Sequence, residues 1–198
     1  MPPEVRRAKF KERLTTYPIP GIGKGLLEAY LARPDTTVIG GVRDILAASS
    51  KALERLPTAQ GSKLILVKID SSSETDAAAA VKTLASQGIT KVDVVIANAG
   101  ISHSYDPVAT LKLADLKDHV TVNTYGPVLL FQAFWPLLQK SAQPKFIVIS
   151  TVSASIGAME HIPFPVASYG ASKAMVNYLT RRIHFENESL IAFPIHPG

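Results

Sequence analysis

The sequence predicts an α/β fold, a doubly wound, Rossmann-like parallel sheet in a single domain. Short apolar runs rich in β-branched residues alternate with segments of helical period along most of the chain. The runs are continuously apolar, as in strands that helices cover on both faces. The chain has 198 residues, 46% of them hydrophobic and 19% charged, which suits one globular domain with a sizeable core.

The first strand of this sheet is atypical. Gly21, Gly23 and Gly25 precede an apolar-periodic run, which is typical of a nucleotide-binding loop that enters a helix. Such a loop normally follows a buried strand, but residues 8–16 (AKFKERLTT) carry many charges. Either this segment fills the place of the first strand despite its charges, or the sheet is loosened there, because an empty place would leave backbone groups unpaired.

The remaining elements follow in regular alternation. Strands are expected at residues 36–42, 63–69, 91–97, 145–150 and 190–195. Helices are expected at residues 44–56, 74–87, 111–140 and 167–187. The chain divides into a basic N-terminal segment, residues 1–16, and one Rossmann-like domain, residues 17–198. Because residue 198 comes directly after the last strand, we expect the C-terminal strand and helices of such a sheet to be missing.

Composition excludes several classes of site. The chain has no cysteine, so disulfides and thiolate metal sites are excluded. His103 and His161 lack ligand spacing, so we interpret them as pocket walls and expect no metal. The longest apolar run, residues 128–138, holds a Gln and a Pro and is too short to span a bilayer. No secretory signal is evident at the N-terminus. We therefore expect a cytoplasmic protein without membrane contact. The net charge of +5 reflects a basic head, which we interpret as a solvated arm and not as a nucleic-acid site.

Two residues near the C-terminus form a candidate acid/base pair. Tyr169 and Lys173 are four apart, so on a helix they share one face. A cation close to a tyrosine favours the phenolate and lowers its pKa, which makes the pair a tunable acid and base. The alternative is an ordinary surface pair.

Other polar residues are expected near the same edge of the sheet. "VIANAG" (95–100) ends a strand at the place where open α/β sheets bind ligands. Asn123 lies inside an apolar helix, an expensive position unless its amide is used. Hydroxyl groups follow the strand at 145–150, at Ser150, Thr151, Ser153 and Ser155.

The order of these motifs resembles the short-chain dehydrogenase/reductase family, over residues 21–198. The segments "GVRD", "ANAG" and "YGASKAMVNYLT" are most similar to the ketoreductases of fungal aromatic polyketide pathways. The resemblance implies a ketoreductase that transfers hydride from NADPH to a carbonyl of an aromatic or polyketide-like secondary metabolite.

The resemblance also implies the catalytic roles. Tyr169 would protonate the carbonyl oxygen, and Lys173 would lower the tyrosine pKa and hold the nicotinamide ribose. Asn123 would fix a water of the proton relay. Thr151 stands where the family has a carbonyl-binding serine, with Ser150 and Ser153 as the other candidates.

Cofactor contacts follow from the resemblance as well. They fall on Gly21, Ile22, Gly23, Arg43, Asp70, Asn98, Ala99, Gly100, Asn123, Tyr169, Lys173, Pro197 and Gly198. The glycine loop would approach the pyrophosphate, and Asp70 the adenine. Sites that prefer NAD have a carboxylate after the second strand, whereas Arg43 follows that strand here. A guanidinium is suited to bind a 2′-phosphate. We therefore expect NADPH to be preferred over NADH. The alternative is a surface pair of Arg43 with Asp44.

One departure from the family pattern suggests a second function. Tyr17 stands at the first glycine of the loop, and Pro18 and Pro20 remove two backbone donors, so the pyrophosphate half of the site is expected to be damaged. Replacing Tyr17 by Gly should then improve cofactor affinity. The alternative function is a truncated homologue, catalytically weak or inactive, that at most pairs with a partner through helix 127–139. That helix is either a homodimer interface or a core helix.

Overall fold

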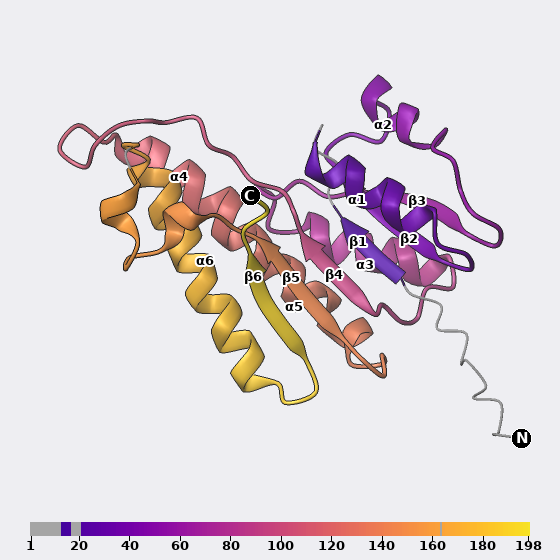
Figure 1. The fold of residues 1–198 in the computed structure, drawn as a ribbon. Helices are drawn as coiled ribbons and strands as arrows, with labels where there is room; N and C mark the ends of the chain where they lie inside the picture. The colour runs from indigo at the N-terminus through magenta and orange to yellow at the C-terminus, as the bar shows by residue number, and fades with distance from the viewer. Residues whose placement is uncertain (1–12, 17–20, 163) are drawn as a thin grey trace, which may run out of the picture.

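The computed structural model describes residues 13–16, 21–162 and 164–198. Its centre is a six-stranded parallel sheet in the order β3-β2-β1-β4-β5-β6 (Figure 1). The strands are β1 (Arg13–Thr16), β2 (Thr37–Val42), β3 (Lys63–Lys68), β4 (Val94–Ala97), β5 (Lys145–Ile149) and β6 (Ile191–Ile195). This order is that of a doubly wound Rossmann sheet, so the predicted fold class is confirmed.

Helices cover both faces of the sheet. They are α1 (Ile22–Leu31), α2 (Ala48–Leu53), α3 (Asp76–Ser86), α4 (Leu113–Val120), a π-helical turn η1 (Thr121–Tyr125), α5 (Gly126–Leu138), two 3₁₀ turns, η2 (Val152–Ala154) and η3 (Met159–His161), and α6 (Ala167–Glu186). One core cluster packs α1 and α2 on the sheet, and the other packs α3, α5 and α6. No helix among the described residues is long and apolar enough to cross a membrane.

Strand β1 fills the central place of the sheet. Leu14 pairs with Val38 of β2 on one side and with Val94 of β4 on the other. Of the two alternatives for the charged head, the structure therefore has the first, and the described strand covers four residues of the segment. Tyr17 and the two prolines after it lie outside the described residues. The boundary between β1 and β4 is the switch point at which such sheets bind ligands.

Two predicted helices differ from the observed ones. The helix expected at 44–56 is shorter in the structure, where only α2 forms. The Asp44 carboxylate accepts a hydrogen bond from Leu46 N–H, and the Asp44 carbonyl oxygen accepts one from the Ser50 hydroxyl. These two hydrogen bonds hold residues 44–47 as a loop. The helix expected at 111–140 is divided into α4 and α5 by the π turn η1. Leu130 and Phe134 of α5 are fully buried in the core, which favours the core alternative for this helix. Its role in a homodimer stays a prediction.

Gly126→Ala is expected to lower the free energy of unfolding by about 1–3 kcal/mol. A Cβ at Gly126 would lie 2.8 Å from the Ser71 carbonyl oxygen, so α5 would have to move away from the turn after β3. Gly25→Ala, at a helical glycine with no atom within 4 Å of an added Cβ, is the matched control and should stabilise the protein by roughly 0.4–1 kcal/mol. Urea denaturation measures both, and equal effects of the two substitutions would contradict the prediction.

Candidate active site

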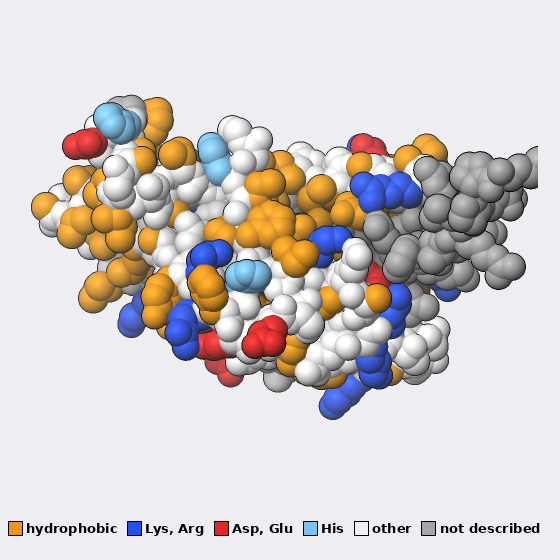
Figure 2. Space-filling view, turned by 60° about the horizontal axis from the view of Figure 1, so that its bottom comes forward, with side chains coloured by type: hydrophobic (Ala, Val, Ile, Leu, Met, Phe, Trp, Pro, Cys, Tyr) orange, Lys and Arg blue, Asp and Glu red, His pale blue; other side chains and the backbone are white. Residues whose placement is uncertain are grey.

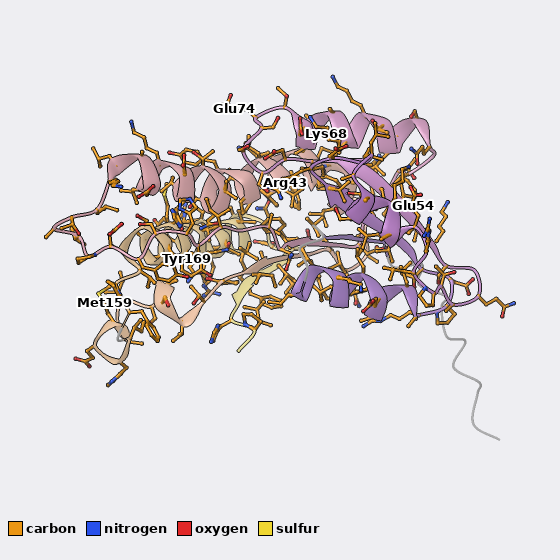
Figure 3. All side chains as sticks on the ribbon, turned by 90° about the horizontal axis from the view of Figure 1, so that it is seen from above. Arg43, Glu54, Lys68, Glu74, Met159 and Tyr169 are labelled. Carbon is orange, nitrogen blue, oxygen red and sulfur yellow. The ribbon has the colours of Figure 1, made fainter. Side chains whose placement is uncertain are left out.

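Tyr169 lies in the first turn of α6, half-buried at the carboxyl edge of the sheet (Figure 3). Burial raises the pKa of Tyr169 above its ordinary value, and the nearby Tyr105 phenol adds to this, while a hydrogen bond with the Thr151 side chain opposes it. A raised pKa keeps the phenol protonated at neutral pH. The phenol therefore holds its proton more tightly than a free tyrosine does.

Lys173 lies one turn further along α6 and is only 3% exposed. Its Nζ donates a hydrogen bond to the Ile149 carbonyl oxygen at the end of β5, at 2.7 Å. Burial lowers the pKa of Lys173 from 10.5 to about 8. Lys173 is not among the groups that shift the pKa of Tyr169 in this structure, and its ammonium donates to a backbone carbonyl, so the expectation that it lowers the tyrosine pKa stays a prediction.

The three candidate hydroxyls after β5 have different partners. Ser150 donates to Asn177 Oδ1 at 2.7 Å, which ties β5 to α6. Thr151 begins the 3₁₀ turn η2, accepts from Ser153 N–H at 3.2 Å and lies near enough to the Tyr169 phenol to lower its pKa. Of the three, Thr151 is thus the one that acts on the tyrosine. Helix α6 can come close to this turn because Gly170 has no side chain. A Cβ at Gly170 would lie 2.8 Å from the Ser153 carbonyl oxygen.

Asn123 is fully buried in the π turn η1. Its amide oxygen accepts from Ile101 N–H at 2.8 Å, and its amide nitrogen donates to Ile101 O at 2.9 Å and to Ser172 Oγ at 3.0 Å. The amide therefore joins the loop after β4 to α6. A Cβ at Gly100 would lie 3.1 Å from Asn123 Oδ1 and 3.3 Å from Lys173 Nζ, so this glycine lets the three groups come together. Single π turns of this kind occur frequently at functional sites.

A second group of predicted residues lies further along the same edge. A cleft of about 770 Å³ follows β2, and both Arg43 and Lys24 line it. Figure 3 looks down on the sheet edge and shows Arg43 well separated from Tyr169 along it. In the described part of the chain Arg43 makes no ion pair with Asp44. Hydrogen bonds from the Ser72 hydroxyl and amide lower the pKa of Asp70, burial opposes this, and the charge of Arg43 adds to the lowering.

The other predicted cofactor residues also follow sheet strands or begin a helix. Gly21 is the N-cap of α1 with a positive φ of 119°, and Ile22 and Gly23 form the first turn of that helix. Asn98, Ala99 and Gly100 follow β4, whereas Pro197 and Gly198 are exposed after β6. The N-terminal end of a helix favours anions.

Two residues of this region were missed in the sequence. Lys24 counts among the basic residues near the head, but only the structure places it on the cleft. His119 is fully buried, and its ring centroid lies 6.5 Å from that of Tyr169. Its position four residues before Asn123, on the same helix face, is the signal that could have identified it.

The chain is similar to known proteins over most of its length. A family model for short chain dehydrogenases matches residues 18–192. Norsolorinic acid ketoreductase nor1 of Dothistroma septosporum is 47% identical over 200 residues, which cover 97% of this chain and 74% of that protein. Norsolorinic acid ketoreductase of Aspergillus parasiticus is 46% identical over 181 residues, 90% of this chain and 66% of that one.

Solved structures give the same result. The NADPH-bound carbonyl reductase from chicken fatty liver has a TM-score of 0.82 and 26% identity, over 94% of this chain and 76% of that one. The sheet order and the matched family model agree. The chain therefore belongs to the short-chain dehydrogenase family, whose members are oxidoreductases that use a nicotinamide cofactor.

Proposed function

We propose that this protein reduces the carbonyl group of an aromatic or polyketide-like ketone with NADPH. The observation that carries the proposal is the meeting of Tyr169, Thr151 and Lys173 at the carboxyl edge of the sheet. The two relatives named above are norsolorinic acid ketoreductases, which supports carbonyl reduction as the reaction type. The alternative of a catalytically weak or inactive homologue is not favoured, because these side chains lie together.

Each side chain has a distinct task in this reaction. The hydride for the carbonyl carbon comes from the reduced nicotinamide when NADPH is bound. Tyr169 Oη gives its proton to the carbonyl oxygen as negative charge develops there. Thr151, near enough to that phenol to act on its pKa, offers a second hydroxyl for the same oxygen. Lys173 has three donors and gives one to Ile149 O within the described part of the chain, so the ammonium is suited to hold ribose hydroxyls.

The cleft after β2 fits the adenosine end of NADPH. Arg43 and Lys24 bring two positive charges to it, and a guanidinium can bind a phosphate through two parallel hydrogen bonds. Val42, Leu53 and Leu56 supply apolar wall, as a flat base requires. This donor set supports NADPH over NADH.

Arg43→Ala is expected to weaken NADPH binding by roughly 10–100-fold and to leave NADH binding nearly unchanged. The lost interaction is a charge-assisted contact to the 2′-phosphate, which NADH lacks. Cofactor fluorescence titration measures both affinities. Lys51→Ala is the matched control, because Lys51 is exposed nearby, pairs with Glu54 and does not line the cleft. Equal losses for NADPH and NADH would contradict the assigned preference.

Exposed side chains around Tyr169 support an aromatic substrate. Tyr105 is 63% exposed yet close enough to shift the pKa of Tyr169. Ile156, Met159 and Phe164 are exposed between β5 and α6, and Figure 3 shows Met159 beyond Tyr169 on the side away from Arg43. A large apolar ketone would cover such residues.

The direct test is to incubate the purified chain with NADPH and an aromatic ketone. NADPH should be oxidised in step with the appearance of the alcohol. A folded chain that binds neither cofactor, or that binds NADPH and reduces no aromatic ketone, would overturn the proposed function.

A homodimer and a cytoplasmic location are further parts of the proposal. Figure 2 shows exposed apolar side chains among polar ones on the face that it views, and exposed apolar patches are typical of protein contacts. Phe131 and Trp135 of α5 are only partly buried, which leaves helix 127–139 some surface for a partner. Sedimentation of the wild type and of Trp135→Lys tests the dimer.

A further inference from the structure

The loop after β4 brings two ring side chains to the catalytic tyrosine. Within residues 101–106, which we call the β4 loop, His103 and Tyr105 are both exposed. The His103 ring centroid lies 4.4 Å from that of His119, and the His119 centroid lies 6.5 Å from that of Tyr169 at an interplanar angle of 70°. Tyr105 is near enough for its phenol to act on Tyr169. The β4 loop therefore lies beside Tyr169.

His119 fixes this loop through both of its ring nitrogens. Its Nδ1 lies 2.6 Å from the Asp115 carbonyl oxygen, which can only accept, so Nδ1 carries the hydrogen and donates it. Its Nε2 lies 3.3 Å from His103 N, which can only donate, so Nε2 is the acceptor. The two contacts select one neutral tautomer and join α4 to the β4 loop.

Asn123 makes the same kind of connection one helical turn later. It binds both backbone groups of Ile101, while His119 binds the backbone N–H of His103. Two side chains at positions i and i+4 of one helix thus hold alternate residues of the loop. Asn123 also reaches α6 through Ser172, and His119 reaches it through the ring of Tyr169. Because His119 is fully buried, it does not itself touch a substrate and acts through the loop and the ring that it contacts.

We propose that His119 is a positioning residue for substrate selection, which sets His103 and Tyr105 as specificity-determining contacts for phenolic ketones beside Tyr169. An imidazole and a phenol each offer a flat face for an aromatic ring and an edge that exchanges hydrogen bonds with a phenolic hydroxyl. A loop held in one position presents these groups at low entropic cost. This inference rests on the proposed function, because it assumes that an aromatic ketone binds before Tyr169.

The experiment compares a hydroxylated acetonaphthone with acetonaphthone itself as substrates, with NADPH. His119→Leu removes both ring contacts, His119→Asn keeps a polar group on the Asp115 side, and His119→Gln keeps an acceptor that can reach His103 N–H. His119→Leu and His119→Asn should raise KM for the hydroxylated ketone by roughly tenfold, with kcat within about threefold and NADPH affinity unchanged. His119→Gln should keep most of the wild-type KM. Hydrogen exchange at residues 101–106 should rise in His119→Leu and His119→Asn but not in His119→Gln.

Two substitutions at the exposed His103 keep the proposal testable if a His119 variant does not fold. His103→Ala should lose the preference for the hydroxylated ketone, and His103→Phe should lose it while still binding acetonaphthone. An unchanged preference in these variants, or kcat and NADPH affinity falling together in His119→Gln, would overturn the inference. If the wild type binds NADPH and reduces neither ketone, the proposed function fails first. The positioning role has its own test in that case. It is overturned if hydrogen exchange in the β4 loop is the same in the His119 variants as in the wild type.

Discussion

Tyr169→Phe should lower kcat for ketone reduction by about 10²–10⁴-fold and leave NADPH affinity and folding stability nearly unchanged. The substitution removes the hydroxyl that delivers the proton and keeps the ring that packs edge-on against His119. The group that faces this hydroxyl is the Thr151 side chain, which lowers the tyrosine pKa. The measurement is steady-state kinetics beside a cofactor titration.

Tyr178→Phe is the matched control, because Tyr178 lies on the same helix and is 67% exposed. Its kcat should equal that of the wild type. A Tyr169→Phe enzyme that keeps most of its kcat would show that the proton comes from another group, and His103 on the β4 loop would then be the next side chain to replace.

Lys173→Met is expected to make the fold more stable while it removes the activity. The pKa of Lys173 falls from 10.5 to about 8 through burial, and this difference corresponds to roughly 3 kcal/mol against the charged form. The lost bond to Ile149 O offsets part of the gain, so the free energy of unfolding at pH 7 should rise by about 1–2 kcal/mol. Urea denaturation measures the stability, and ketone reduction measures the loss.

The pH dependence of this difference has a definite sign. Below pH 8 Lys173 is charged in the folded and the unfolded chain, so the cost of burying the charge is complete. As the pH rises from about 8 towards 10.5, the folded chain loses this proton first, and its stability rises relative to the unfolded chain. The advantage of Lys173→Met over the wild type should therefore shrink over this range.

Lys82→Met serves as the control for a generic methionine effect. Lys82 is exposed on α3, so its substitution should neither stabilise the chain nor change how stability depends on pH. A Lys173→Met variant that is less stable than the wild type at pH 7 would mean that the bond to Ile149 O outweighs the cost of burial.

Most of the sheet was predictable because its strands are short, apolar runs, and β2 and β4 are buried at every residue. The apolar runs at 36–42 and 63–69 differ from β2 and β3 only at their ends. Strand β1 could not be predicted from its composition, because a short segment between two strands is held by backbone pairing, which does not depend on side-chain character. The π turn was not predictable either, since residues 111–140 have helical period throughout and one extra residue in a turn leaves no mark in that pattern.

The catalytic side chains were easier to find than their environment. The spacing of Tyr169 and Lys173 already places them on one helix face. The burial that raises the pKa of Tyr169 could not be predicted, because no local pattern reports how much water the fold removes from the phenol. Ser150 and Thr151 could not be separated in the sequence, since only the position of Asn177 on α6 decides which hydroxyl is already bonded.

The central position of β1 also has a kinetic consequence. The pairing of Leu14 with Val94 joins residues further apart in sequence than any other strand pair. Closing so long a loop costs entropy before any contact repays it, so the two halves of the sheet, β1–β3 and β4–β6, are expected to form before they meet. Arg43 follows β2 in the first half, and Tyr169 lies on α6 between β5 and β6 in the second. A bound dinucleotide that contacts both residues would therefore link the two halves and slow their separation during unfolding.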